Sequence, residues 1–134
     1  MLHHISFAVA DLTRAAAFYD AVLSALCYRR VWEDPTFIGY GLHPGQDLFA
    51  LKLRPDHAQA LGDGFHLAFA APSREAVTAF YEAAMSHGGT DNGGSGLHPE
   101  YGADYFAAFV IDPDGYRIEA VITTPLANDP FNGY

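Results

Sequence analysis

Basic residues are scarce in this 134-residue chain. It has 7 lysines and arginines, of which Lys52 is the single lysine, against 16 aspartates and glutamates, so its formal net charge is -9. An acidic surface repels the phosphates of nucleic acids, and no basic cluster offsets that charge here. We therefore expect no nucleic-acid partner.

Cysteine and long apolar runs are also nearly absent. Cys27 alone cannot form an intrachain disulfide or a cysteine metal cage, and we expect it to be a small buried apolar side chain. The longest apolar runs, such as residues 105–111, are far shorter than the roughly 20 residues that span a bilayer. The first residues lack the basic segment and apolar core of a signal peptide. These absences predict a cytoplasmic protein with no membrane partner.

Apolar residues, in contrast, make up half of the sequence, and 14% of the residues are aromatic. That content is ample for one core in a chain of this length. We predict a single domain over residues 1–124 and a C-terminal tail over 125–134, where two prolines occur without any hydrophobic period.

The sequence repeats itself at an offset of 62 residues. Residues 4–24 align without a gap with residues 66–86, and eight of these 21 positions are identical, the histidines at 4 and 66 among them. Asp11 and Ser73, both good N-cap residues, occupy equivalent positions. The chain is therefore interpreted as two copies of one module, over about residues 1–54 and 63–124.

Each copy is predicted to begin with an alternating strand and to continue with an amphipathic helix and three shorter strands. The first copy has the strands 3–9, 27–33, 37–41 and 47–53 and the helix 12–26. The second has the strands 65–71, a weak one near 97–101, 105–111 and 116–122, and the helix 73–87. Six glycines within 88–104 predict a mobile loop. The fold class is α+β, with two tandem βαβββ modules that form a curved mixed sheet around a cavity.

Strand alternation places polar side chains that could bind a metal on one face of each module. His4 and His66 lie opposite the large apolar residues of their strands, and Glu119 lies opposite the apolar residues of the last strand. A lone strand histidine is more often structural than a ligand. A carboxylate inside an apolar strand is harder to explain in that way, because burying it unpaired costs on the order of several kcal/mol. Two imidazoles and one carboxylate on three strands suit a divalent metal and leave positions open for substrate.

These motifs resemble the vicinal oxygen chelate superfamily, which includes glyoxalase I, extradiol dioxygenases, fosfomycin-resistance transferases and bleomycin-resistance proteins. The resemblance covers essentially residues 2–124. It is carried by the His4-x6-Asp-Leu segment, by Phe18-Tyr19, by the Gly-Phe-His-Leu-Ala-Phe segment at 64–69 and by Asp-Pro-Asp-Gly-Tyr-Arg-Ile-Glu at 112–119. The chain looks most like the small glyoxalase-like proteins of bacteria.

The resemblance implies a metal site of His4, His66 and Glu119 for iron, nickel, zinc or manganese. It also implies a small-molecule substrate and a homodimer, with the site formed either within one chain or across two. Glyoxalase I has a fourth ligand, a glutamate, where this chain has Ala50, which argues against true glyoxalase I activity.

The resemblance favours an enzyme whose metal acts as a Lewis acid on a small oxygen-chelating substrate, in a lyase or dioxygenase-like reaction. The alternative is a non-catalytic small-molecule or drug-binding protein of the bleomycin-resistance type. A fosfomycin-type thiol transferase ranks lower, because the loop 90–95 has no lysine for a phosphonate.

Five further residues are candidates for the substrate pocket. Tyr105 and Phe109 form an aromatic wall if their strand turns them inward, and core packing is about as good an explanation. His98 and Tyr101 follow the glycine-rich loop and are placed to close over a substrate, although loop residues are usually at the surface. Arg117 shares the face of Glu119, where it either pairs with that carboxylate, holds an anionic substrate or is simply exposed.

Overall fold

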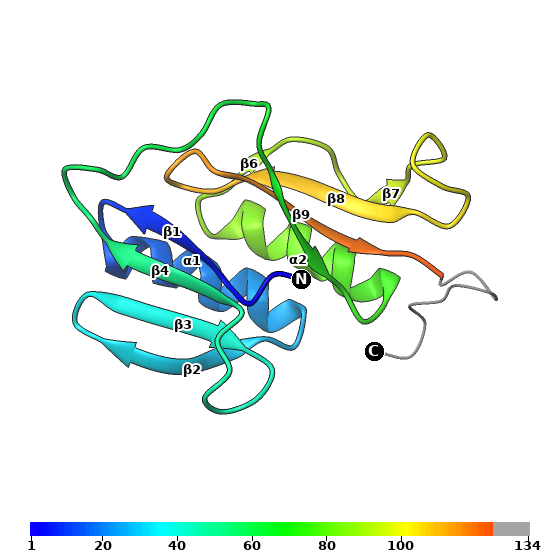
Figure 1. Ribbon diagram of the computed structural model, residues 1–134. Helices are drawn as coiled ribbons and strands as arrows, with labels where there is room; N and C mark the ends of the chain where they lie inside the picture. Colours follow the sequence, from blue (N-terminus) through cyan, green and yellow to red (C-terminus); the bar gives the residue numbers. More distant parts are fainter. Residues whose placement is uncertain (125–134) are drawn as a thin grey trace.

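The computed structural model describes residues 1–124, and the tail predicted at 125–134 lies outside them. The first module consists of β1 (Ile5–Val9), α1 (Leu12–Ala25), β2 (Arg29–Asp34), β3 (Phe37–Gly41) and β4 (Phe49–Leu53). The second consists of β5 (Leu67–Ala70), α2 (Arg74–Ser86), β6 (Thr90–Asp91), β7 (Gly96–Leu97), β8 (Phe106–Ile111) and β9 (Arg117–Ile122). Figure 1 shows the two modules and labels every one of these elements except β5.

Both modules order their strands in the same way. The first sheet has the order β1-β4-β3-β2 and the second the order β5-β9-β8-β6, with β7 also paired to β8. In each sheet the opening strand runs parallel to the last strand, and the other pairs are antiparallel. The predicted α+β fold of two repeated modules is thereby confirmed, and it is built from two open mixed sheets.

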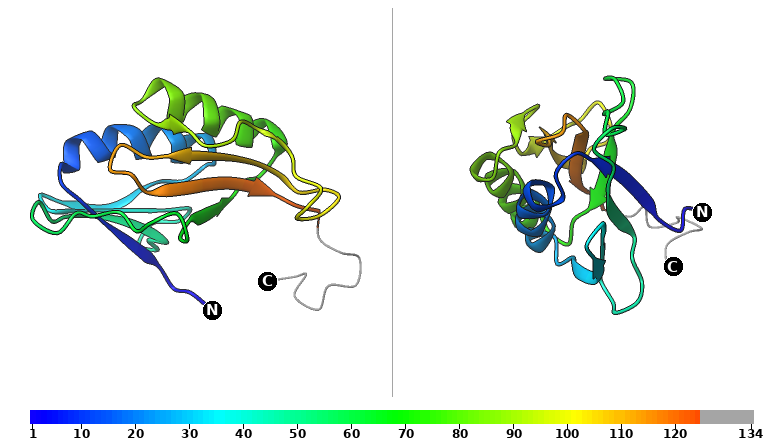
Figure 2. Two further views of the ribbon diagram at one scale, coloured as in Figure 1. Left: turned by 90° about the horizontal axis from the view of Figure 1, so that it is seen from above. Right: turned by 90° about the vertical axis from the view of Figure 1, so that its left-hand side faces the viewer.

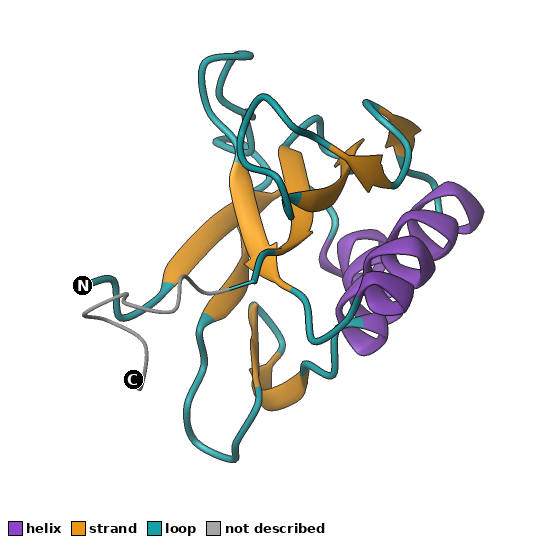
Figure 3. Ribbon diagram, turned by 90° about the vertical axis from the view of Figure 1, so that its right-hand side faces the viewer, coloured by secondary structure: helices purple, strands orange, loops and turns teal. Residues whose placement is uncertain are grey.

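The two helices lie side by side on one side of the molecule, and the two sheets diverge from them (Figure 3). Both predicted N-caps are formed: the Asp11 carboxylate accepts from the backbone N–H of Arg14, and the Ser73 hydroxyl accepts from that of Ala76, each at 3.0 Å. Apolar helix side chains at three- and four-residue spacing fill the core beneath them. No helix within residues 1–124 has both the length and the hydrophobicity that a bilayer crossing requires.

Two local expectations were wrong. The single weak strand near 97–101 is replaced by the two-residue strands β6 and β7, because the glycines of this segment allow only brief pairing along β8. Cys27 is exposed rather than buried. It follows the C-cap of α1 with φ +69°, in the left-handed position where a helix commonly ends in glycine, and this turns its side chain outward.

The turn between β8 and β9 fastens the second module to the first. Asp112 is buried, and its carboxylate accepts hydrogen bonds from the Tyr19 hydroxyl of α1 at 2.5 Å and from the backbone N–H groups of Asp114 and Tyr116. The Tyr116 hydroxyl in turn donates to the carbonyl of Ala8 at 2.7 Å. These contacts fix the orientation of the two modules within the chain.

Candidate metal and substrate site

The second sheet positions the candidate ligand Glu119. One row across the sheet contains Phe109 of β8, Glu119 of β9 and Ala68 of β5, which lie in register. Since successive side chains of a strand point to opposite faces, Arg117 lies on the same face as Glu119. The other face of the sheet packs against α2 and is filled by the core.

Glu119 is only 1% exposed, and both of its carboxylate oxygens have partners. Its Oε2 lies 3.0 Å from Nε2 of His66, and its Oε1 accepts a hydrogen bond from the Tyr105 hydroxyl. A buried carboxylate is expensive without such partners. The His66 side chain is 55% exposed, so the pair is buried on the carboxylate side and open on the imidazole side.

Four of the predicted pocket residues form one aromatic cluster beside this pair. The ring of His98 lies 5.1 Å from that of Phe109 and 6.0 Å from that of Tyr101, and Tyr101 lies 5.2 Å from Tyr105 between centroids. Burial, and then the neighbouring Glu119 carboxylate, raise the pKa of the Tyr105 hydroxyl, which therefore stays a hydrogen-bond donor at neutral pH. The direct bond from Tyr105 to Glu119 was not foreseen from the sequence.

Arg117, the fifth predicted pocket residue, is half-buried at the start of β9, in register with Ile111. Its guanidinium makes no ion pair with the described residues, and the oxygens of Glu119 are engaged by Tyr105 and His66. Of the interpretations open at the sequence level, pairing with Glu119 is therefore not the one observed.

His4 does not join His66 and Glu119 within the chain. It precedes β1, whose N-terminal end projects from the body of the molecule (Figure 2), and its imidazole contacts that of His3 at 2.9 Å. It borders a small hollow of about 190 Å³ between β1 and β5. Accordingly, residues 1–124 of one chain contain no group of three histidine, cysteine or acidic side chains that could hold a metal ion.

Ala50 occupies the position at which the sequence comparison with glyoxalase I expects a fourth ligand. Ala50 lies in register with Ser6 on β1 and with Gly39 on β3. It therefore lies on the face of the first sheet to which strand alternation also assigns His4. A methyl group there supplies no metal ligand.

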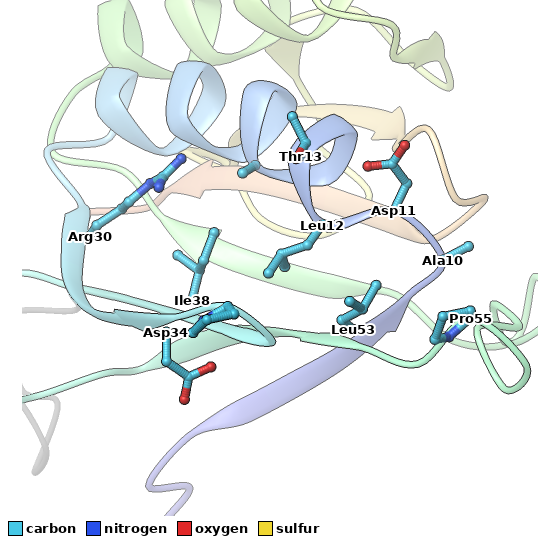
Figure 4. Close-up of a pocket in the computed structure, with 11 residues that line it drawn as sticks. Ala10, Asp11, Leu12, Thr13, Arg30, Asp34, Ile38, Leu53 and Pro55 are labelled. Carbon is cyan, nitrogen blue, oxygen red and sulfur yellow. The ribbon is translucent and has the colours of Figure 1, made fainter.

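A larger hollow of about 700 Å³ lies elsewhere, between the start of α1 and the first sheet (Figure 4). Its charged side chains are already engaged: Arg30 contacts Asp20 at 2.6 Å and Glu33 at 2.7 Å, and Asp11 caps α1. None of the candidate ligands lines this hollow. The candidate ligands therefore lie outside this hollow.

Comparison with solved structures finds the same architecture in several proteins. A glyoxalase/bleomycin resistance protein from Albidiferax ferrireducens T118 is 28% identical, with a TM-score of 0.79 over 92% of this chain and 99% of that chain. A putative glyoxalase from Bacillus halodurans is 26% identical, with a TM-score of 0.67 over 90% of this chain and 94% of that one. A glyoxalase I mutant from Zea mays is similar in fold at 20% identity, with a TM-score of 0.67 over 88% of this chain and 44% of that protein.

The family model that matches the sequence covers almost the whole described chain. No curated protein matches this sequence. The model, described as the Glyoxalase/Bleomycin resistance protein/Dioxygenase superfamily, matches residues 1–120. Since the repeated modules, the sheet order and this match agree, the chain belongs to the glyoxalase/bleomycin resistance protein/dioxygenase superfamily.

Proposed function

We propose that the protein is a divalent-metal-dependent enzyme that acts on a small oxygen-chelating substrate, in a lyase or dioxygenase-like reaction. Membership of the superfamily supports a metal-dependent enzyme or a binding protein in general. The observation that carries the enzymatic proposal is the pairing of the buried Glu119 carboxylate with the half-exposed imidazole of His66.

The residues present fit a divalent ion in their chemistry. An imidazole nitrogen and a carboxylate oxygen are donors that iron, nickel, zinc and manganese accept. These two donors lie 3.0 Å apart, Glu119 on β9 and His66 immediately before the adjacent strand β5, so the protein has already met the cost of burying the carboxylate. An ion bound there would act as a Lewis acid on two neighbouring oxygens of the substrate.

The chain's own residues would then have separate tasks. His66 and Glu119 would hold the ion, and Tyr105 would keep the Oε1 oxygen of Glu119 turned toward its hydroxyl. Phe109 and His98 lie beside the pair and would exclude water from one side of a bound substrate.

We further propose that the third ligand, His4, comes from a second copy of the chain in a homodimer. His4 and Glu119 lie on equivalent faces of the two repeated modules, and His4 stands at the projecting end of β1. A second copy would bring the first module of one chain against the second module of the other.

Metal analysis tests this proposal. The purified protein is reconstituted separately with iron, nickel, zinc and manganese, and the bound metal per chain is measured. We expect stoichiometric binding of one preferred ion and its loss in His4→Ala, His66→Ala and Glu119→Ala. The matched control is His57→Ala, which removes an exposed histidine of the segment between β4 and β5 that is not a candidate ligand, and this variant should bind the metal like the parent.

Retention of metal by all three ligand variants, or no metal in the parent, would contradict the proposal. The second case would favour the alternative, a non-catalytic small-molecule binding protein. One observation favours that alternative: a single chain, over residues 1–124, does not bring three metal-binding side chains together.

A further inference from the structure

The basic side chains of this acidic chain divide into two groups. Four are held by a carboxylate, a backbone carbonyl or an aromatic ring: Arg14, Arg30, Arg54 and Arg74. The other three have no ion pair, side-chain hydrogen bond or aromatic ring contact within residues 1–124: Arg29, Lys52 and Arg117. In a chain of net charge -9, where acidic partners are abundant, a cation left unpaired in a fixed strand position calls for an explanation.

Two of these three cations lie on the sheet faces that carry the candidate ligands. Arg117 is the first residue of β9 and lies on the same face as Glu119. The parallel strand β5 begins beside it, and His66 immediately precedes β5. Lys52 lies in register with Ala8, so it is on the face of the first sheet to which strand alternation also assigns His4. Arg29, in contrast, is on the exposed edge strand β2.

Arg117 is half-buried, unlike Arg29, and no carboxylate of the described residues pairs with its guanidinium. Glu119 does not supply that carboxylate, because Tyr105 and His66 occupy its two oxygens. The place beside Arg117 is therefore open to an anion from outside the chain.

We propose that the site takes a small monocarboxylate, whose carboxylate binds the Arg117 guanidinium. In the homodimer that we propose, Lys52 of the partner subunit would stand on the face that meets it. This inference rests on the proposed function, because it assigns a substrate class to the same site. A guanidinium offers a carboxylate two parallel hydrogen bonds. The acidic chain disfavours a doubly charged phosphate or phosphonate, since its overall field repels the second negative charge.

The test compares three ligands that share a phenyl ring and a hydroxyl group: mandelate, the uncharged 1-phenylethane-1,2-diol and the dianionic hydroxy(phenyl)methylphosphonate. Their affinities are measured by calorimetry on the metal-loaded protein and on the metal-free protein. We expect the parent to bind mandelate more tightly than either of the other two ligands. Arg117→Gln should weaken mandelate binding about 10- to 100-fold, as for a lost charged hydrogen bond, and leave diol binding unchanged.

Two controls separate this outcome from damage to the metal site. Arg29→Gln removes an unpaired arginine outside the site and should change no affinity. Bound metal per chain should be the same in Arg117→Gln as in the parent. Equal loss of mandelate and diol binding in Arg117→Gln, no loss of either, or tighter binding of the phosphonate than of mandelate would overturn the inference. If the parent binds no metal, the proposed function fails, and the mandelate and diol affinities of the metal-free protein still decide the role of Arg117.

Discussion

Glu119 is an ionisable side chain in a position that the fold fills elsewhere with apolar residues. Its neighbours along β9, Ile118 and Ala120, are buried in the core, and it is equally inaccessible. Tyr105 and His66 compensate for its burial, one at each oxygen. Of these two partners only His66 can also bind a metal, so the role that we assign to Tyr105 is to orient the carboxylate.

Removal of the Tyr105 hydroxyl tests that role. Tyr105→Phe keeps the ring in the aromatic cluster and leaves Oε1 of the buried carboxylate without its donor. Because side chains that hydrogen-bond to metal ligands typically contribute about 10- to 100-fold to metal affinity, we expect metal binding to weaken by about 10-fold, measured by competition with a chelator.

Tyr101→Phe is the control for this variant, since Tyr101 belongs to the same cluster but is 64% exposed. Equal metal affinities of the two variants would show that Tyr105 does not position Glu119.

Among the elements, the turn between β8 and β9 contains a carboxyl group, that of Asp112, whose pKa is strongly raised. Burial raises the pKa of Asp112 to about 6, against hydrogen bonds from Tyr19 and the backbone that lower it. The folded protein therefore binds this proton more tightly than the unfolded chain, whose carboxyl has a pKa of about 3.9. The contribution of Asp112 to stability is greatest below pH 4 and is lost as the pH rises through 6.

Asp112→Asn tests this pH dependence because it removes the titrating group but keeps an acceptor for the backbone N–H groups. We expect the free energy of unfolding of the parent, relative to the variant, to fall by about 1–3 kcal/mol between pH 4 and pH 6.5. The measurement is denaturant unfolding of both proteins across this range. Parallel pH profiles for the two proteins would contradict it.

The elements themselves were largely predictable, because strand alternation, helix periodicity and N-caps repeat in both modules. Asp11 and Ser73 begin their helices as expected. The segment 88–104 was not predictable in detail, because pairing of glycine-rich strands depends on the neighbour β8 rather than on local pattern. The exposure of Cys27 follows from its positive φ, a conformation that the residue type does not suggest.

The candidate site was predictable only in part, for a physical reason at each residue. Alternation placed Glu119 and Arg117 on one face, and register then brought Phe109 beside Glu119. The Tyr105 hydrogen bond depends on the path of the chain as it enters β8, which no periodicity encodes. The location of the third ligand, His4, depends on a second copy of the chain in our account.

At the scale of the whole molecule, the two modules are docked through their helices and through the contacts of Tyr19 and Tyr116 across the module boundary. In our account, this docking leaves the face of His4 and the face of Glu119 to be covered by different neighbours. A site shared between two copies follows if each copy supplies one of these faces.

A mixed dimer of complementary variants tests this central claim most directly. His4→Ala and Glu119→Ala chains are co-expressed with different affinity tags, the dimer that carries both tags is purified, and its bound metal is measured. If His4 of one chain joins His66 and Glu119 of the other, one of the two sites in this dimer keeps all three ligands. The account therefore predicts one metal ion per mixed dimer, with none in either variant alone. A mixed dimer without metal, while the parent dimer binds two ions, would contradict a site shared between chains.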